Sequence, residues 1–394
     1  MSALFEDFTR AASQSKTAAP KTARQFSRIA VLGGGADARQ LAALCLAEGA
    51  EVTLFSAYGA ELEMVRSSSG IGLRGTGPIG TYHVDRESTS IKTTAEIDGA
   101  VRGAEVIFLT GPVHKQRTYA MVLADHLNDG QVLVLAPGRS LGAVETAWML
   151  RMGGCRADVT IVERQGLPYW MRVEGANLHL SAAGPQMIAT LPSGRVDVIE
   201  GLAPFLTPSL VAGSVLESGF ADLSGAVEIP ALVLGGVALA KGGPEVPMGA
   251  NPLPENNTMA NLLGKDHRAV IETLAQERRK VAAAFGVRNL PQNAEWVAMY
   301  AGSTSGEGAR PVPTTSECPA ILRDGVMGSL MPLISAAGVA GVDAPVTQSM
   351  VTLAETILGD TVATAGRRLE TIGITSQNID NARRRFDVIL SGGL

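Results

Sequence analysis

The stretch Arg28–Ser56, RIAVLGGGADARQLAALCLAEGAEVTLFS, decides the fold of this chain. Its first five residues are β-branched or aliphatic apart from the arginine, which predicts a buried parallel strand that stops at Gly33. Apolar residues recur at helical spacing from Ala36 to Gly49, and a second strand is expected over Glu51–Phe55. The stretch therefore predicts the succession strand, glycine turn, helix, strand.

The glycines of this turn are spaced as G-x-G-x-x-A, the pattern of a dinucleotide-binding turn. Gly33 permits the tight turn, Gly35 lets the backbone approach a pyrophosphate, and Ala38 lets the helix pack closely. Gly34 and Ala36 complete the turn, and the helix N-terminus offers N–H groups to phosphates. A glycine-rich turn without a ligand is the alternative, because the chain has 45 glycines. The position between a strand and a helix favours the nucleotide.

Composition narrows the class of protein. The 394 residues, 46% of them hydrophobic, are enough for two domains. The net charge of −5 gives no electrostatic reason to expect nucleic acid or an anionic membrane as a partner. The apolar stretches 229–240 and 329–342 are too short and too rich in glycine to span a bilayer. Three widely separated cysteines fit a reducing compartment, so we expect a cytoplasmic protein without a metal site.

Strand and helix patterns alternate as far as residue 163, which predicts an α/β Rossmann domain with a doubly wound parallel sheet. Segments 177–183 and 186–191 are expected to form a closing β-hairpin or edge strands. From about residue 207 the pattern is helical and predicts an all-α C-terminal domain. We therefore expect a mobile tail over 1–26, the dinucleotide-binding domain over 27–200 and a helical substrate domain over 201–394.

Turns at the carboxyl ends of the strands are the expected cofactor site, because ligands bind there in open parallel sheets. Thr110, Pro112 and His114 follow the strand expected over 105–109, and Pro137 follows the strand expected over 131–136. We expect these four residues to contact the nucleotide, with His114 close to the nicotinamide or the substrate.

The end of the second strand bears on the choice of nucleotide. An acidic residue there would bind the adenosine ribose hydroxyls and repel a 2′-phosphate, but the position holds Ser56. The missing acid favours NADP(H) as the cofactor, with NAD(H) as the alternative because no arginine immediately follows Ser56. Arg39 and Arg66 are candidate partners for the phosphate, although each also fits a solvated helix position.

The second half of the chain resembles a known family. Residues 276–287, QERRKVAAAFGV, followed by Glu295 and Trp296, resemble the helix pair of the opine dehydrogenases, the octopine/nopaline dehydrogenase group. The similarity extends to Pro112-x-His114, to Pro137-Gly138, to residues 159–163 with Arg172 downstream, and to 368–374 near the C-terminus. The resemblance implies a Rossmann domain and a helical domain with the substrates between them. It also implies reduction, by NAD(P)H, of the imine formed from an amino acid and a 2-oxo acid.

The resemblance further implies a catalytic histidine on the first long helix of the second domain, assisted by an aspartate. The corresponding segment here, 218–230, contains no histidine, and its histidine position falls on Glu228 or Val227 depending on the register. We expect Glu228 to act as the proton donor if burial raises its pKa, the alternative being a structural carboxylate paired with an arginine. The partner aspartate corresponds to Asp324, and His267 is a further candidate for the missing histidine.

Arginines are expected to bind the substrate carboxylates, because guanidinium groups hold carboxylates by paired hydrogen bonds. Arg139, Arg172 and Arg323 are the candidates, and Glu163 at a strand end is expected nearby. The favoured function is that of an NAD(P)-dependent opine dehydrogenase-like oxidoreductase acting on small amino acid and 2-oxo acid substrates. A 2-hydroxy acid or ketoacid oxidoreductase and a non-catalytic nucleotide sensor are the alternatives. A homodimer is the candidate assembly.

Overall fold

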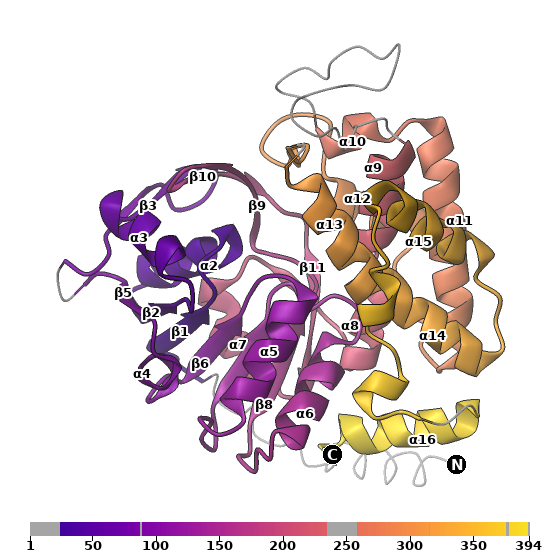
Figure 1. Cartoon of the computed structure of the whole chain (residues 1–394), viewed down its shortest axis with the longest axis horizontal. Helices are drawn as coiled ribbons and strands as arrows, with labels where there is room; N and C mark the ends of the chain where they lie inside the picture. The colour runs from indigo at the N-terminus through magenta and orange to yellow at the C-terminus, as the bar shows by residue number, and fades with distance from the viewer. Residues whose placement is uncertain (1–23, 87–88, 235–257, 315, 376–377, 393–394) are drawn as a thin grey trace, which may run out of the picture.

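An eight-stranded sheet forms the core of the N-terminal half of the computed structural model, which describes residues 24–86, 89–234, 258–314, 316–375 and 378–392 (Figure 1). The strand order is β12-β11-β8-β7-β6-β1-β2-β5, and neighbouring strands are parallel except β11 and β8. The strands are β1 (Arg28–Leu32), β2 (Glu51–Phe55), β5 (Lys92–Thr94), β6 (Val106–Leu109), β7 (Val132–Leu135), β8 (Thr160–Arg164), β11 (Gln186–Leu191) and β12 (Ser209–Val211). Most of the tail expected over 1–26 lies outside the described residues.

Helices alternate with these strands, as the sequence predicts. They are α2 (Ala36–Ala47), α3 (Gly59–Ser67), α4 (Ile97–Val101), α5 (Val113–Leu123), α6 (Gly142–Met152) and α7 (Val196–Leu202). Strands β6 and β7 are buried throughout, which fits their continuous apolar sequences. Leu32 at the end of β1 pairs in register with Phe55 of β2 and Leu109 of β6, so the carboxyl ends of these strands meet at one edge. The predicted doubly wound sheet is confirmed.

A second, four-stranded sheet lies beside the first, in the order β4-β3-β10-β9 (Figure 1). Its strands are β3 (Ile71–Gly75), β4 (Gly80–Tyr82), β9 (Tyr169–Glu174) and β10 (Asn177–Ala182). Both alternatives expected for 177–183 and 186–191, a hairpin or edge strands, are wrong, because β10 lies between β3 and β9 while β11 lies between β12 and β8 in the large sheet. Burial explains the separation. Every residue of β11 is buried, whereas the first four residues of β10 alternate between exposed and buried.

The C-terminal half is helical, as expected. Its helices are α8 (Val215–Ala221), α9 (Ser224–Leu234), α10 (Met259–Leu262), α11 (Lys265–Ala284), α12 (Asn293–Ala301), α13 (Cys318–Gly325), α14 (Met331–Ala340), α15 (Pro345–Leu358) and α16 (Ile379–Leu390). A π-helical turn, Val326–Leu330, joins α13 to α14. Residues 366–369 lie outside these helices, because the N–H of Arg367 bonds to the carbonyl of Met327 and a 3₁₀ turn, η4, follows at Glu370–Ile372.

The helical segment Cys318–Ala340 is continuous through α13, the π-helical turn and α14. It has the length and hydropathy of a membrane span, but 72% of its most apolar window is buried inside the protein. Such burial is typical of a core helix.

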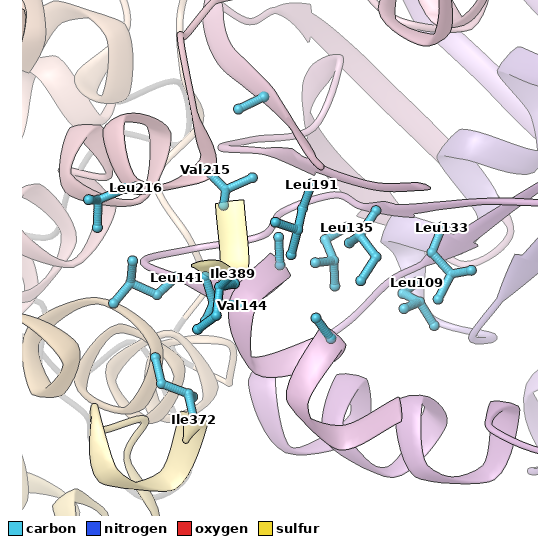
Figure 2. Close-up of a cluster of buried hydrophobic side chains, with 14 of the residues drawn as sticks. Leu109, Leu133, Leu135, Leu141, Val144, Leu191, Val215, Leu216, Ile372 and Ile389 are labelled. Atoms are coloured by element: carbon cyan, nitrogen blue, oxygen red, sulfur yellow. The ribbon is translucent and has the colours of Figure 1, made fainter. Parts of the chain in front are cut away.

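An apolar cluster joins the sheet to the helical half. Figure 2 shows side chains from the sheet, from α6 and α8, and from the C-terminal elements meeting in this cluster. The labelled members are Leu109, Leu133, Leu135, Leu141, Val144, Leu191, Val215, Leu216, Ile372 and Ile389. Shared burial of this kind stabilises the two halves against each other. The domain boundary expected at residue 200 stays a prediction, and β12 extends the large sheet to Val211.

We predict that Gly33→Ala destabilises the fold by about 2–4 kcal/mol. Gly33 has φ +127°, and a methyl group added to it would lie 2.4 Å from Thr110 Oγ1. Gly35→Ala is the matched control, because a methyl group there meets no atom within 4 Å, and we expect it to cost less than about 1 kcal/mol. Urea unfolding measures both. Equal costs for the two variants would contradict the prediction.

Candidate active site

The buried guanidinium of Arg139 holds together three segments that are far apart in the sequence. Arg139 follows β7, is 9% exposed, and donates from Nε to Asp324 Oδ2 at 3.0 Å. Its Nη1 donates to Ser224 Oγ at 2.5 Å and to Glu228 Oε2 at 3.0 Å. Ser224 and Glu228 lie on α9 and Asp324 lies on α13. Three predicted site residues, Arg139, Glu228 and Asp324, therefore meet where the sheet contacts the helical half.

Glu228 is held between two arginines. Its Oε1 accepts a hydrogen bond from Nη2 of Arg310 at 2.6 Å, while its Oε2 accepts the bond from Arg139. Burial alone would raise the pKa of Glu228, but the charges and hydrogen bonds of Arg139 and Arg310 outweigh it and lower the pKa below the ordinary value. Glu228 is thus the ion-paired carboxylate that was the alternative, and its catalytic role stays a prediction.

Asp324 links the same cluster to the turn after β6. Its Oδ1 accepts the N–H of Val113, the first residue of α5, at 2.8 Å. Pro112 is the N-cap of this helix, and His114 is exposed in its first turn. The turns after β6 and β7 are also tied together, because Nε2 of Gln116 donates to the carbonyl of Pro137 at 2.8 Å. The charged cluster thus lies at the carboxyl ends of these strands.

Asp37 is a further carboxyl at this edge. It lies in the first turn of α2, directly after the glycine turn. Burial, together with the charge of Asp324, raises the pKa of Asp37 to about 6, against the smaller opposing effect of Arg139 and Arg39. Asp37 is therefore close enough to the ion pair of Asp324 and Arg139 for both charges to affect its pKa. A carboxyl with this pKa can gain or lose a proton near neutral pH.

The loop that carries Arg139 is fixed by contacts from the C-terminal region. Arg139 and Leu141 have φ values of 59° and 62°, a region that residues other than glycine rarely adopt. The buried Arg367 donates from Nη1 to the carbonyls of Gly138 and Ser140. Its Nε donates to Glu145 Oε2 at 2.8 Å. These bonds hold the loop in a conformation that is unfavourable by itself.

The glycine turn has room for a pyrophosphate. A side chain at Gly35 would meet no atom within 4 Å, and Gly35 caps α2 without a side-chain hydrogen bond. A methyl group at Gly33 would lie 3.5 Å from Cβ of Ala38, so helix and strand are in close contact there. Thr110 supports the turn, since its Oγ1 donates to the carbonyl of Leu32 at 2.8 Å. Gly34 and Ala36 lie within the same turn, at the N-terminus of α2. The residues present therefore fit a dinucleotide.

Three other predicted residues lie apart from the Arg139 cluster. Arg172 is exposed on β9 opposite His179, and Arg323 pairs with Asp360 at 3.3 Å. His267 lies in the first turn of α11, where its Nε2 is buried with no hydrogen-bond partner among the described residues. Burial lowers its pKa.

Glu163 is fully buried beneath the turn that contains Gly138. It accepts hydrogen bonds from the N–H of Ala143 at 2.9 Å and from Ser218 Oγ at 2.7 Å. Burial raises its pKa to about 7, despite these bonds and the charge of Arg367. These contacts position the Arg139 loop and the start of α6.

Three residues of the site were missed by sequence reasoning. Asp37 could have been found, because it follows the glycine turn directly. Arg310 and Ser224 carry no local signal, since their roles depend on contacts with Glu228 and Arg139. Within the described ranges, no group of three or more histidine, cysteine, aspartate or glutamate side chains could hold a metal ion.

Comparison with known proteins supports the resemblance seen in the sequence. No family model matches the chain. An opine dehydrogenase of Arthrobacter sp. (strain 1C) is 25% identical over 270 residues, which are 68% of this chain and 70% of that protein. The chain is therefore related to the opine dehydrogenases.

Solved structures confirm the fold. Octopine dehydrogenase with NADH and pyruvate has a TM-score of 0.67 and 16% identity, and the match covers 93% of this chain and 98% of that chain. Yersinopine dehydrogenase with bound NADP⁺ has a TM-score of 0.56 and 14% identity, with the same coverage of both chains. At these identities the likeness concerns the architecture, a Rossmann-like sheet followed by a helical region.

We predict strong coupling between Glu228 and Arg310. Glu228→Gln leaves two buried guanidinium groups without this counter-charge, and we expect a loss of about 3 kcal/mol or more. In the Arg310→Gln variant, residue 310 no longer carries a charge that Glu228 must balance. Introducing Glu228→Gln into that variant should therefore cost about 2 kcal/mol less than introducing it into the wild-type protein. Urea unfolding of the four proteins measures this coupling. If the costs of the two single substitutions add up to the cost of the double variant within about 0.5 kcal/mol, the coupling through the ion pair is contradicted.

We also predict that Asp37→Asn stabilises the protein above pH 6. The pKa of Asp37 is raised from 3.8 to about 6 on folding, so ionisation costs stability as the pH rises between these values. Allowing for partial exposure, the gain should be about 1–2 kcal/mol at pH 7.5 and should vanish below pH 4. Thermal unfolding from pH 3.5 to 8 measures it.

The matched control is Asp266→Asn, in the first turn of α11 and exposed. This variant removes a favourable charge from a helix N-terminus, so it should lower stability slightly, by about 0.3–1 kcal/mol. A destabilised Asp37→Asn variant at pH 7.5 would show that the Asp37 carboxylate is favourable in the folded state.

Proposed function

We propose that this chain, a relative of the opine dehydrogenases, is an NAD(P)H-dependent oxidoreductase that reduces the imine formed from an amino acid and a 2-oxo acid. The observation that carries the proposal is the cluster of Arg139, Glu228 and Asp324 at the sheet edge that also holds the glycine turn. The relation to the Arthrobacter enzyme supports it. A cytoplasmic location and a homodimer belong to the same proposal.

The nucleotide would be held by the glycine turn and the first turn of α2. Gly33 forms the turn, Gly35 leaves open space for the pyrophosphate, and the N–H groups of residues 36–38 at the helix N-terminus would be the donors to the phosphates. Bound there, the nucleotide supplies a hydride. Pro112 and His114 at the start of α5 and Pro137 after β7 border the same edge.

The charges of the site suit a cationic intermediate. Condensation of an amine with a 2-oxo acid takes up one proton, releases water and yields an iminium ion. Glu228, kept ionised by its arginines, and Asp324 place carboxylates in this site that would stabilise such a cation locally, while Arg139 and Arg310 balance their total charge. Asp37, with a pKa of about 6, is the group suited to exchange the proton. Arg139 and Arg310 supply the guanidinium groups that would attract the substrate carboxylates.

The ionised state of Glu228 also separates imine reduction from ketone reduction. Hydride addition to a ketone forms an alkoxide that needs a proton donor at once, whereas hydride addition to an iminium ion gives a neutral amine. A carboxylate held between two guanidinium groups cannot serve as that donor. Glu228 therefore suits the imine as the hydride acceptor, and reduction of a 2-oxo acid alone would depend on Asp37 for its proton.

We predict that oxidation of the reduced nucleotide by this protein requires an amine. Purified protein is mixed with NADH or NADPH, pyruvate and pooled amino acids, and absorbance at the nicotinamide band is followed. Turnover should appear with both substrates present and fall to background without the amino acids. Equal turnover with pyruvate alone would favour a ketoacid reductase. Tight nucleotide binding without turnover in any mixture would favour a sensor.

A further inference from the structure

A glutamate from α3 occupies the end of β2, where the sequence shows no acid. Glu61 lies in the first turn of α3, and its Oε2 accepts a hydrogen bond from Ser56 Oγ at 2.5 Å. Ser56 is fully buried directly after β2. The carboxylate therefore lies at the strand end that faces the adenosine ribose in dinucleotide-binding sheets.

The same carboxylate packs against the glycine turn. A methyl group added to Gly34 would lie 2.3 Å from Oε2 of Glu61 and 2.5 Å from its Cβ. Gly34 is the middle glycine of the turn, so Glu61 lies against the segment that would carry the nucleotide. This second contact is independent of the bond to Ser56, and together they fix the carboxylate between the turn and the end of β2.

The two arginines considered as partners of a 2′-phosphate are engaged elsewhere. Arg39 is 4% exposed and donates from Nη1 to the carbonyl of Gly175 at 2.6 Å. Arg66 donates from Nε to Asp85 Oδ2 at 3.0 Å and to Thr93 Oγ1 at 2.9 Å. Neither guanidinium donates a hydrogen bond to Ser56 or Glu61, although the charge of the buried Arg39 acts on the Glu61 carboxylate.

Lys115 is the cation that these contacts place beside Glu61. Its Nζ lies 3.7 Å from Oε1 of Glu61 and 4.9 Å from the ring centroid of Tyr58. Lys115 and Arg39 together supply two positive charges, which are fewer than the nearly three negative charges that Glu61 and a 2′-phosphate would bring. The two hydroxyls of an unphosphorylated ribose can instead donate hydrogen bonds to the carboxylate.

We propose that Glu61 makes the nucleotide site selective for NAD(H) over NADP(H), by accepting hydrogen bonds from the adenosine ribose and repelling a 2′-phosphate. The inference rests on the proposed function, because it needs a dinucleotide in the glycine turn. It reverses the basis of the NADP(H) preference drawn from the sequence, where the acid was sought at Ser56 itself. The acid comes from the next helix, five residues later.

Binding of each reduced nucleotide to the full chain, measured by calorimetry, tests this selectivity. Wild-type protein should bind NADH about 10-fold or more tightly than NADPH. Glu61→Gln keeps the shape of the side chain and removes its charge, so it should strengthen NADPH binding by about 10-fold while changing NADH binding by less than about 3-fold. Glu63→Gln, which removes an exposed charge two residues away on α3, is the matched control and should leave both affinities unchanged.

The outcomes are distinguishable. Equal affinities for NADH and NADPH in the wild type, or an unchanged ratio in Glu61→Gln, would overturn the selectivity while leaving the proposed function in place. Failure of both nucleotides to bind the wild-type protein would overturn the proposed function, and the selectivity with it. Thermal unfolding of each variant shows whether it is folded.

Discussion

The fold depends on the pairing of one buried cation. Arg139 lies between the sheet and the helical half, and a guanidinium so far from water is tolerated when carboxylates compensate its charge. Glu228 and Asp324 provide that charge from α9 and α13, which fixes both helices against the turn after β7. The loop around Arg139 has an unfavourable backbone conformation, and the hydrogen bonds of Arg367 keep it in place. The apolar cluster adds contact area, whereas the ion pairs fix the relative positions.

This pairing also governs the chemistry of the site. Two guanidinium groups keep Glu228 ionised, and Glu228 is one of the two positions, with Val227, on which the histidine of the resemblance falls. Arg139 and Arg310 balance the charges of Glu228 and Asp324, so an iminium ion would be stabilised by nearby carboxylates and not by a net negative charge. Proton exchange then falls to Asp37, whose pKa of about 6 results from burial beside Asp324. Its position directly after the glycine turn brings this proton close to the place where the nucleotide would bind.

The glycine turn and the end of β2 provide the contacts for the nucleotide in the N-terminal half. Gly35 provides open space for phosphates, and Glu61 provides a negative charge for the ribose side. Both depend on the alignment of strand ends in a parallel sheet, because β1, β2 and β6 finish at one edge. The selectivity between NAD(H) and NADP(H) is thereby decided by Glu61 on α3, whereas the deciding acid usually lies at the end of β2.

The sequence by itself determined the alternation of strands and helices, the glycine turn, and the candidacy of Arg139, Glu228 and Asp324, because periodicity and turn chemistry act over a few residues. It could not determine the pKa of Glu228 or the role of Arg310, because the partners lie 82 to 185 residues apart along the chain and meet through packing. It also misplaced β10, whose pairing with β9 and β3 depends on distant backbone. Tertiary structure decided these features, since charge and hydrogen bonding depend on distance in space.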